Sequence, residues 1–278
     1  MPKARKKKAP ITGPGPSEVA SGKPETTRTV IRRFHVLLKR QTQLEQASTK
    51  DAATTQELAK IAAEIEAHGG LEKYQEMSAI GQSSDRGGGS EKVLIGWLKE
   101  LQVKPAEGSA KLRLLEVGAL KPDNYKSCQA WIDATPIDLH SRHPAIQEQD
   151  FLKMNEDEHR SSWDIISTSL VVNFVPDAKD RGRMLRLAHT MLKPDGLLFL
   201  ALPLPCILNS RYVTPEYIQG LMKVIGFAQV RSRWREGGKM AYWLYRKQDG
   251  KLAASIDFDF QRKVVLRTGH RNNFAILL

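Results

Sequence analysis

A single glycine and an aspartate lie 20 residues apart in the middle of this chain, a spacing that suits the binding of a nucleoside. The segment 112–120 (LRLLEVGAL) has the apolar run of a buried strand and reaches Gly118, and Asp138 follows the next apolar segment. In nucleotide-binding βα units, an acidic residue about 20 positions after the first glycine binds the ribose hydroxyls. Dinucleotide fingerprints carry three glycines, because the backbone must approach a pyrophosphate. One glycine therefore favours a ligand that has a ribose and no pyrophosphate.

S-adenosylmethionine is a ligand of this kind, since it contains an adenosine and no phosphate. Gly118 would then let the chain pass beneath its methionyl and ribose groups without an intruding side chain. The alternative is structural: a glycine that ends a strand and an aspartate that starts a turn. A second carboxylate favours the ligand, because Asp150 comes 12 residues after Asp138, at the expected end of a third strand. There Asp150 could accept a hydrogen bond from the adenine amine, and Phe151 could cover the ring.

The order of the expected elements agrees with a site at the ends of strands. Apolar spacing predicts helices over 29–46, 52–67, 70–82, 91–101, 177–192 and 214–224. Strands are expected over 113–117, 129–137, 163–172, 197–202, 228–234 and 240–246. This alternation predicts an α/β fold with a mostly parallel sheet and helices on both faces. In such a sheet, ligands bind beyond the carboxyl ends of the strands.

Composition divides the chain into three parts: a basic, disordered tail (1–28), a helical extension (29–110) and the α/β domain (111–278). Residues 1–50 hold 12 Lys and Arg against 3 Asp and Glu, and residues 211–278 hold 13 against 5. The middle is acidic, with 18 against 23. Two basic ends around an acidic middle indicate that the ends contact a polyanion. The alternative is that these charges only keep the chain in solution.

Several classes of protein are disfavoured. The longest apolar run, 196–208, contains two prolines and is too short to span a bilayer, so we expect no membrane partner. Two cysteines without a CxxC pair favour neither a zinc site nor a disulfide framework, and we expect no metal. The tryptophans at 131, 163, 234 and 243 lie in strand-like patterns and are expected in the core.

The motifs LEVGAL, IDLHS, QDF, SLVVNFVPD and LKPDG follow one another over residues 112–246, and this succession resembles class I S-adenosylmethionine-dependent methyltransferases. The resemblance implies a Rossmann-like sheet of seven strands. Further motifs are Tyr74-Gln75, Gly81-Gln82, Arg181-Gly182 and Arg271-Asn-Asn-Phe274. With them, residues 70–278 resemble one family, the fungal nucleolar methyltransferases that modify N(1) of an adenine in large-subunit (25S) rRNA. This family implies S-adenosylmethionine as cofactor and large-subunit rRNA or a pre-ribosomal particle as partner. It also implies a nucleolar location in the nucleus, and we expect a monomer.

The resemblance implies roles for individual residues as well. Gly118 and Asp138 carry the cofactor, and the candidate cofactor-binding residues also include Glu116, Asp150, Phe151 and Arg86. Arg86 lies in a glycine-rich loop and could pair with the methionine carboxylate, because a guanidinium matches a carboxylate. The alternative for Arg86 is a solvated loop charge.

The residues after the strand 163–172, which corresponds to the fourth strand of this fold, face the methyl group. Asn173 and Phe174 stand there, and we predict that the amide bonds the edge of the base while the aromatic ring stacks on it. The alternative is that Phe174 packs in the core and Asn173 caps the next helix.

The N(1) atom of adenine has a lone pair and no proton to lose, so its methylation needs no general base, and positioning supplies most of the catalysis. N(1) lies on the Watson–Crick edge, so the target adenine must be unpaired or extruded. A related branch shares the Tyr-Gln and Gly-Gln motifs, but senses S-adenosylmethionine and acts through a protein partner without catalysis. That sensor is the main alternative, and a protein or small-molecule methyltransferase is the third. The basic ends favour the RNA enzyme, because RNA binding gains from each Lys and Arg.

Overall fold

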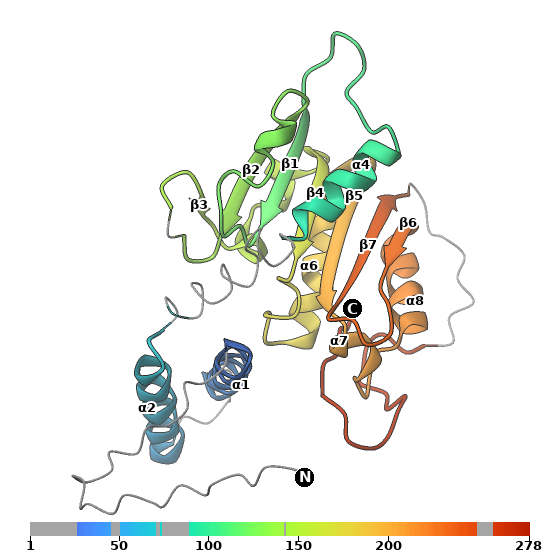
Figure 1. The fold of residues 1–278 in the computed structure, drawn as a ribbon. Helices are drawn as coiled ribbons and strands as arrows, with labels where there is room; N and C mark the ends of the chain where they lie inside the picture. Colours follow the sequence, from blue (N-terminus) through green and yellow to red (C-terminus); the bar gives the residue numbers. More distant parts are fainter. Residues whose placement is uncertain (1–26, 46–50, 71–72, 74–88, 142, 249–257) are drawn as a thin grey trace, which may run out of the picture.

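A computed structural model gives the fold, and it describes residues 27–45, 51–70, 73, 89–141, 143–248 and 258–278 (Figure 1). Most of the basic tail 1–28 and of the expected helix 70–82 lies outside these residues. The first helices are α1 (Thr27–Glu45), α2 (Ala52–Ala67) and α4 (Glu91–Glu100). Next come β1 (Leu112–Val117), η2 (Lys126–Cys128), β2 (Ile132–Asp138), β3 (Gln147–Glu148), η3 (Phe151–Lys153), α5 (Glu156–His159) and β4 (Trp163–Ser169). The last are α6 (Ala178–Met191), β5 (Leu192–Pro203), α7 (Pro205–Leu208), α8 (Pro215–Ile225), β6 (Phe227–Arg233) and β7 (Met240–Lys247).

Seven strands form one sheet in the order β3-β2-β1-β4-β5-β7-β6. All neighbouring pairs from β3 to β5 are parallel, and only β7 runs antiparallel to its neighbours β5 and β6. This confirms the predicted Rossmann-like sheet. The chain moves from β1 outward to β2 and β3 and then returns to β4 beside β1. In open α/β sheets, ligands bind at this reversal of strand order.

Helices cover both faces of the sheet, with α4 on one face and α6 and α8 on the other (Figure 1). Adjacent residues of the central strands therefore point into different cores. Leu114 packs in the cluster that contains α4, and Leu115 packs in the cluster that contains α6 and α8. Because both faces are covered, β1 and β4 are apolar at successive positions rather than at every second one.

The two long helices of the second face start where their sequence predicts. The Asp177 carboxylate caps α6 by accepting from the backbone N–H of Lys179 (2.7 Å) and Asp180 (3.2 Å). The Thr214 hydroxyl caps α8 in the same way, and Gly226 ends α8 with a left-handed φ of +109°. Such caps satisfy N–H groups that have no partner within the helix.

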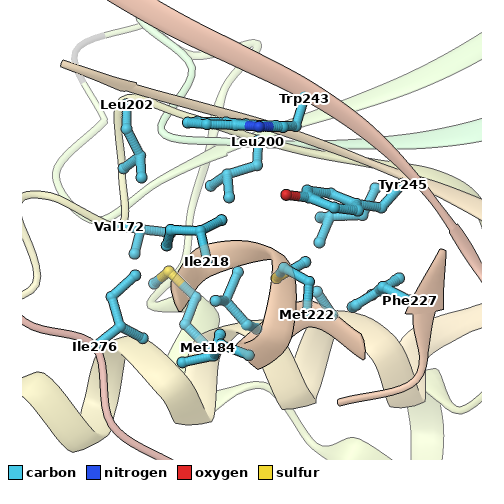
Figure 2. Packing of buried hydrophobic residues seen from close by; sticks show 14 of the residues in the cluster. Val172, Met184, Leu200, Leu202, Ile218, Met222, Phe227, Trp243, Tyr245 and Ile276 are labelled. Carbon is cyan, nitrogen blue, oxygen red and sulfur yellow. The ribbon is translucent and has the colours of Figure 1, made fainter. Parts of the chain in front are cut away.

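The C-terminal segment, residues 258–278, packs on the domain without forming a strand, although residues 262–267 and 273–278 alternate or run apolar in the manner of strands. Side-chain hydroxyls donate hydrogen bonds to its backbone carbonyls instead. The hydroxyls of Ser210 and Tyr217 donate to the carbonyls of Phe274 (2.6 Å) and Ile276 (2.7 Å). These side-chain donors satisfy the two carbonyls without a neighbouring strand. The last five residues are nevertheless all buried, and Figure 2 shows Ile276 among the core side chains of the sheet and α6.

Helix α6 carries two adjacent residues that fit the C-terminal segment. Arg181 is only 5% exposed, and its guanidinium donates to the carbonyls of Val175 (2.8 Å) and Ala275 (2.6 Å). At Gly182, a Cβ atom would lie 1.8 Å from the carbonyl oxygen of Leu277. The Arg-Gly pair and the end of the chain are thus two halves of one contact.

Helices α1 and α2 pack against each other and reach the loop that follows β4. Val30 and Phe34 of α1 are buried, and Ile65 of α2 and Phe174 pack against them. The division of the chain at residue 110 stays a prediction; α4, which precedes that point, packs on the sheet.

Two local expectations are corrected. Strand β4 ends at Ser169 rather than at residue 172, because Leu170 has a left-handed φ of +58° that interrupts the extended backbone. Trp234 lies past the end of β6 and is 43% exposed, whereas Trp163 and Trp243 are buried as expected.

The contact at Gly182 predicts a large effect from a single methyl group. Gly182→Ala should lower the free energy of unfolding by about 2 kcal/mol or more, because the C-terminal backbone must move away. Gly96→Ala in α4 is the matched control: no atom lies within 4 Å of its Cβ position, and alanine favours a helix. Thermal unfolding of both variants measures the effect, and equal melting temperatures would contradict the contact.

Candidate cofactor and substrate site

The candidate site lies at the carboxyl ends of β1, β2, β3 and β4, and the loops that follow these strands are numbered in the same order. Backbone bonds tie the loops together: the N–H groups of Gly118 (2.8 Å) and Ala119 (3.0 Å) both donate to the carbonyl of Ile137. The N–H of Gln149 donates to the carbonyl of Asp138 (2.8 Å). The structure thus brings Gly118, Asp138 and the start of the third loop together, as their spacing predicted.

A side chain at position 118 would be unfavourable for two reasons. The φ of Gly118 is +75°, in the left-handed region. A Cβ atom there would lie 2.5 Å from Cγ2 of Val171, in the loop after β4. Ligand access was the reason predicted for this glycine, and the close approach of Val171 is a second reason that the sequence does not reveal. No local pattern could have revealed Val171, which follows 53 residues later.

Asp138 ends β2 with its carboxylate partly buried. Its Oδ1 accepts from the backbone N–H of His140 (2.9 Å), which fixes the orientation of the group. Burial raises the pKa of Asp138, and the hydrogen bond from His140 acts in the opposite direction. A fixed carboxylate at the end of the second strand is the group that the ribose role requires.

Glu116 is the most unusual acid of the site, because it points from β1 into a buried position and is 8% exposed. The side-chain amide of Asn124 donates to its Oε1 (2.7 Å). Burial raises the pKa of Glu116 to about 7; the bond from Asn124 lowers it, and the charge of Glu91 raises it further. Nothing in the sequence pattern marked Asn124 as its partner.

In the loop after β3, Asp150 and Phe151 are not placed as expected. Asp150 caps η3, with its Oδ1 accepting from the N–H of Leu152 (3.0 Å). Phe151 is 3% exposed and packs in the core, so its ring does not line the surface of the loop. Leu152 is the partly exposed apolar side chain at this point. Apolar character alone could not tell which of the two neighbours faces inward.

Asn173 and Phe174 follow β4, as predicted. The side-chain Oδ1 of Asn173 is buried and has no hydrogen-bond partner among the described residues. The alternative in which Asn173 caps the next helix is wrong, because Asp177 caps α6. Phe174 is partly exposed and packs against Val30 and Phe34, not in the main core. A buried acceptor without a protein partner costs about 1–3 kcal/mol unless a water molecule or a ligand bonds to it.

The N-terminus of α4 also reaches this site. The hydroxyls of Ser90, just before α4, and Ser169, at the end of β4, are hydrogen-bonded to each other. Arg86, the residue predicted to hold the methionine carboxylate, lies outside the described residues. Ser90 is four residues further on, so the glycine-rich loop that contains Arg86 ends beside β4.

The described residues contain no group of three or more His, Cys, Asp or Glu side chains that could hold a metal ion. Within the same residues, no helix has the length and apolar character needed to cross a membrane.

Comparisons with known proteins agree with each other. The family model described as 25S rRNA (adenine(2142)-N(1))-methyltransferase, Bmt2, matches residues 59–276. The 25S rRNA adenine-N(1) methyltransferase of Schizosaccharomyces pombe is 34% identical over 256 residues, which cover 89% of each chain. The 25S rRNA (adenine(2142)-N(1))-methyltransferase of Saccharomyces cerevisiae is 32% identical over 254 residues, which cover 89% of this chain and 71% of that protein.

Two solved structures with lower identity are also similar. The CurJ carbon methyltransferase has a TM-score of 0.49 at 14% identity, covering 80% of this chain and 70% of that one. The 1,6-didemethyltoxoflavin-N1-methyltransferase of Burkholderia thailandensis, solved with S-adenosylhomocysteine, has a TM-score of 0.42 at 15% identity, covering 55% and 75%.

The raised pKa of Glu116 predicts how stability depends on pH. Between pH 4.5 and about 7 the folded chain holds a proton that the unfolded chain has released, so stability falls as the pH rises through this window. The loss should reach about 3 kcal/mol in the ligand-free protein. Glu116→Gln keeps an acceptor for Asn124 and carries no charge, so its stability should fall less over the same range.

Urea unfolding at pH 5, 6, 7 and 8 measures this difference. Glu100→Gln, an exposed position at the end of α4, is the control and should follow the wild type. Parallel pH curves for wild type and Glu116→Gln would show that Glu116 is ionised throughout.

Proposed function

Because this chain belongs to the Bmt2 family of 25S rRNA adenine-N(1) methyltransferases, we propose that its β1–β2 edge holds S-adenosylmethionine and that Asn173 positions the target adenine. The chain is an S-adenosylmethionine-dependent 25S rRNA adenine-N(1) methyltransferase. The matching family is one of enzymes, which favours catalysis over the non-catalytic sensor.

The residues of the site fit S-adenosylmethionine. When bound, this cofactor supplies an electrophilic methyl group on a sulfonium. Asp138 offers a fixed, partly buried carboxylate to the ribose hydroxyls. Gly118 has no side chain to project from the turn beside Asp138. We propose that Glu116 and Asp150 complete the acidic lining of the site, with Leu152 on the apolar side and Arg86 at the methionine carboxylate.

The unpartnered Oδ1 of Asn173 is the observation that carries the substrate role. Adenine has an amino donor beside N(1) on its Watson–Crick edge. A hydrogen bond from this amine to Asn173 would satisfy the buried oxygen and turn N(1) toward the cofactor edge of the sheet. The lone pair of N(1) is already free of a proton, so orientation rather than proton removal is what the chain must provide.

Phe174 connects this loop to the N-terminal helices. Part of its ring packs against α1, and we propose that its exposed part stacks on the target base. The helices α1 and α2 would then hold the base-binding loop in place. The target adenine has to leave its helix or be unpaired to reach this loop.

Two variants should separate cofactor binding from methyl transfer. Asp138→Ala should weaken S-adenosylmethionine binding tenfold or more, since charge-assisted hydrogen bonds contribute about 1.5–3 kcal/mol. Asn173→Ala should leave that affinity unchanged and slow single-turnover methylation of rRNA at least tenfold. It should also keep or raise the melting temperature, because it removes a buried oxygen without a partner.

Calorimetry and single-turnover transfer from labelled cofactor measure the two effects. Asp133→Ala is the matched control for Asp138, because Asp133 lies in the same strand and is exposed. Wild-type cofactor affinity in Asp138→Ala would contradict the assignment of Asp138 to the ribose. Full transfer by Asn173→Ala would do the same for the base assignment.

We also propose that the enzyme works in the nucleolus, where rRNA is made, and that the basic run Lys3-Ala-Arg-Lys-Lys-Lys8 supports its entry into the nucleus. A fluorescent fusion without residues 1–27 should accumulate outside the nucleus. Unchanged nucleolar fluorescence would contradict the role of this tail.

A further inference from the structure

A pocket between α1, the start of α6 and the C-terminal segment joins three parts of the chain that are far apart in sequence. Each part contributes a cation: Lys39 from α1, Arg181 from α6 and Lys263 from the C-terminal segment. Gln43 and Asn273 add amide groups. This cationic pocket is separate from the cofactor edge at Gly118 and Asp138, and none of the roles described above uses its lysines.

Positive charge is in excess in the cationic pocket. Asp177 is the one carboxylate among the described residues that line it, and its Oδ1 already caps α6. Arg181 bonds to carbonyl oxygens and forms no ion pair within the described part of the chain. Burial lowers the pKa of Lys39, and the charges of Arg181 and Lys263 lower it further. An anion in the pocket would relieve this repulsion.

The available donors suit a phosphate group. The ammonium groups of Lys39 and Lys263 can reach a phosphate as point charges from two sides of the pocket. The Oδ1 of Asn273 accepts from Nη1 of Arg211 (2.6 Å), so its amide nitrogen is the end that can donate to a ligand. Arg211 adds a further positive charge behind it.

The cationic pocket adjoins the loop that is proposed to bind the base. Pro176 and Asp177 line the pocket, and Asn173 lies three residues before Pro176. An RNA strand that places a base at Asn173 carries a phosphate on either side of that nucleotide. Both basic ends of the chain were predicted to contact a polyanion. The cationic pocket offers one place for this contact, since Lys39 and Lys263 come from opposite ends of the chain.

We propose that the cationic pocket binds a backbone phosphate of the rRNA strand next to the target adenine. The proposal rests on the proposed function, which supplies RNA as the substrate. Phosphate contacts position a strand without reading its sequence, so the pocket would set the register of the strand relative to Asn173.

Removal of the two lysine charges tests the pocket in the full-length protein. Lys39→Gln/Lys263→Gln should bind a 25S rRNA transcript about tenfold more weakly at low salt. The slope of log affinity against log salt should become smaller by about 1. Lys99→Gln/Lys104→Gln is the matched control, because it removes the same charge from exposed positions at and after the end of α4. Affinity for S-adenosylmethionine should be the same in all three proteins.

The comparison of RNA affinities decides on the pocket whether or not methyl transfer is observed, so failure of the proposed function remains a separate result. Weaker binding and a smaller slope in the pocket variant alone would support the phosphate site. Wild-type binding by the pocket variant would overturn it. An equal loss in both variants would also overturn it, because the lysines would then act only through net charge.

Discussion

The geometry of the site depends on the hydrogen bonds that the buried guanidinium of Arg181 donates. It donates to the carbonyls of Val175 and Pro176, which end the loop after β4, and to the carbonyl of Ala275 in the C-terminal segment. Its central carbon also lies 4.6 Å from the centre of the Phe274 ring. Loss of this side chain would leave buried carbonyls without donors, at a cost of about 1–3 kcal/mol each. One residue of α6 therefore holds both the base-binding loop and the end of the chain.

The same loop is held under strain at its other end. Leu170 has a left-handed φ of +58°, a conformation that costs a non-glycine residue about 1–3 kcal/mol. Val171 then packs directly against Gly118, and Asn173 buries an oxygen without a partner. Leu170 and Asn173 thus place two unfavourable features in the loop after β4. The well-packed sheet on either side offsets their cost, which is the pattern expected where stability has been given up for function.

The sequence predicts those parts of the fold that depend on local patterns. The bounds of α2 and the end of β2 at Asp138 agree with their apolar spacing, and the distance from Gly118 to Asp138 identifies the cofactor edge. The conformation of the C-terminal segment could not be predicted, because its alternating residues suit a strand as well as the irregular segment that is observed. Side-chain donors from Ser210 and Tyr217, distant in sequence, bond to two of its carbonyls in place of a neighbouring strand. Likewise, Phe174 contacts Phe34, 140 positions earlier, and no local signal links the two.

The central claim is that methyl transfer goes to N(1) of adenine, by orientation and without a general base. It is tested most directly by incubating the purified full-length protein with 25S rRNA and labelled S-adenosylmethionine. The RNA is then digested to nucleosides, and the labelled product is identified by chromatography and mass spectrometry. The label should be found in 1-methyladenosine, and Asp138→Ala should yield little of it. Label in N(6)-methyladenosine would contradict the account, because the exocyclic amine, which must lose a proton, would then be the group held at the methyl donor.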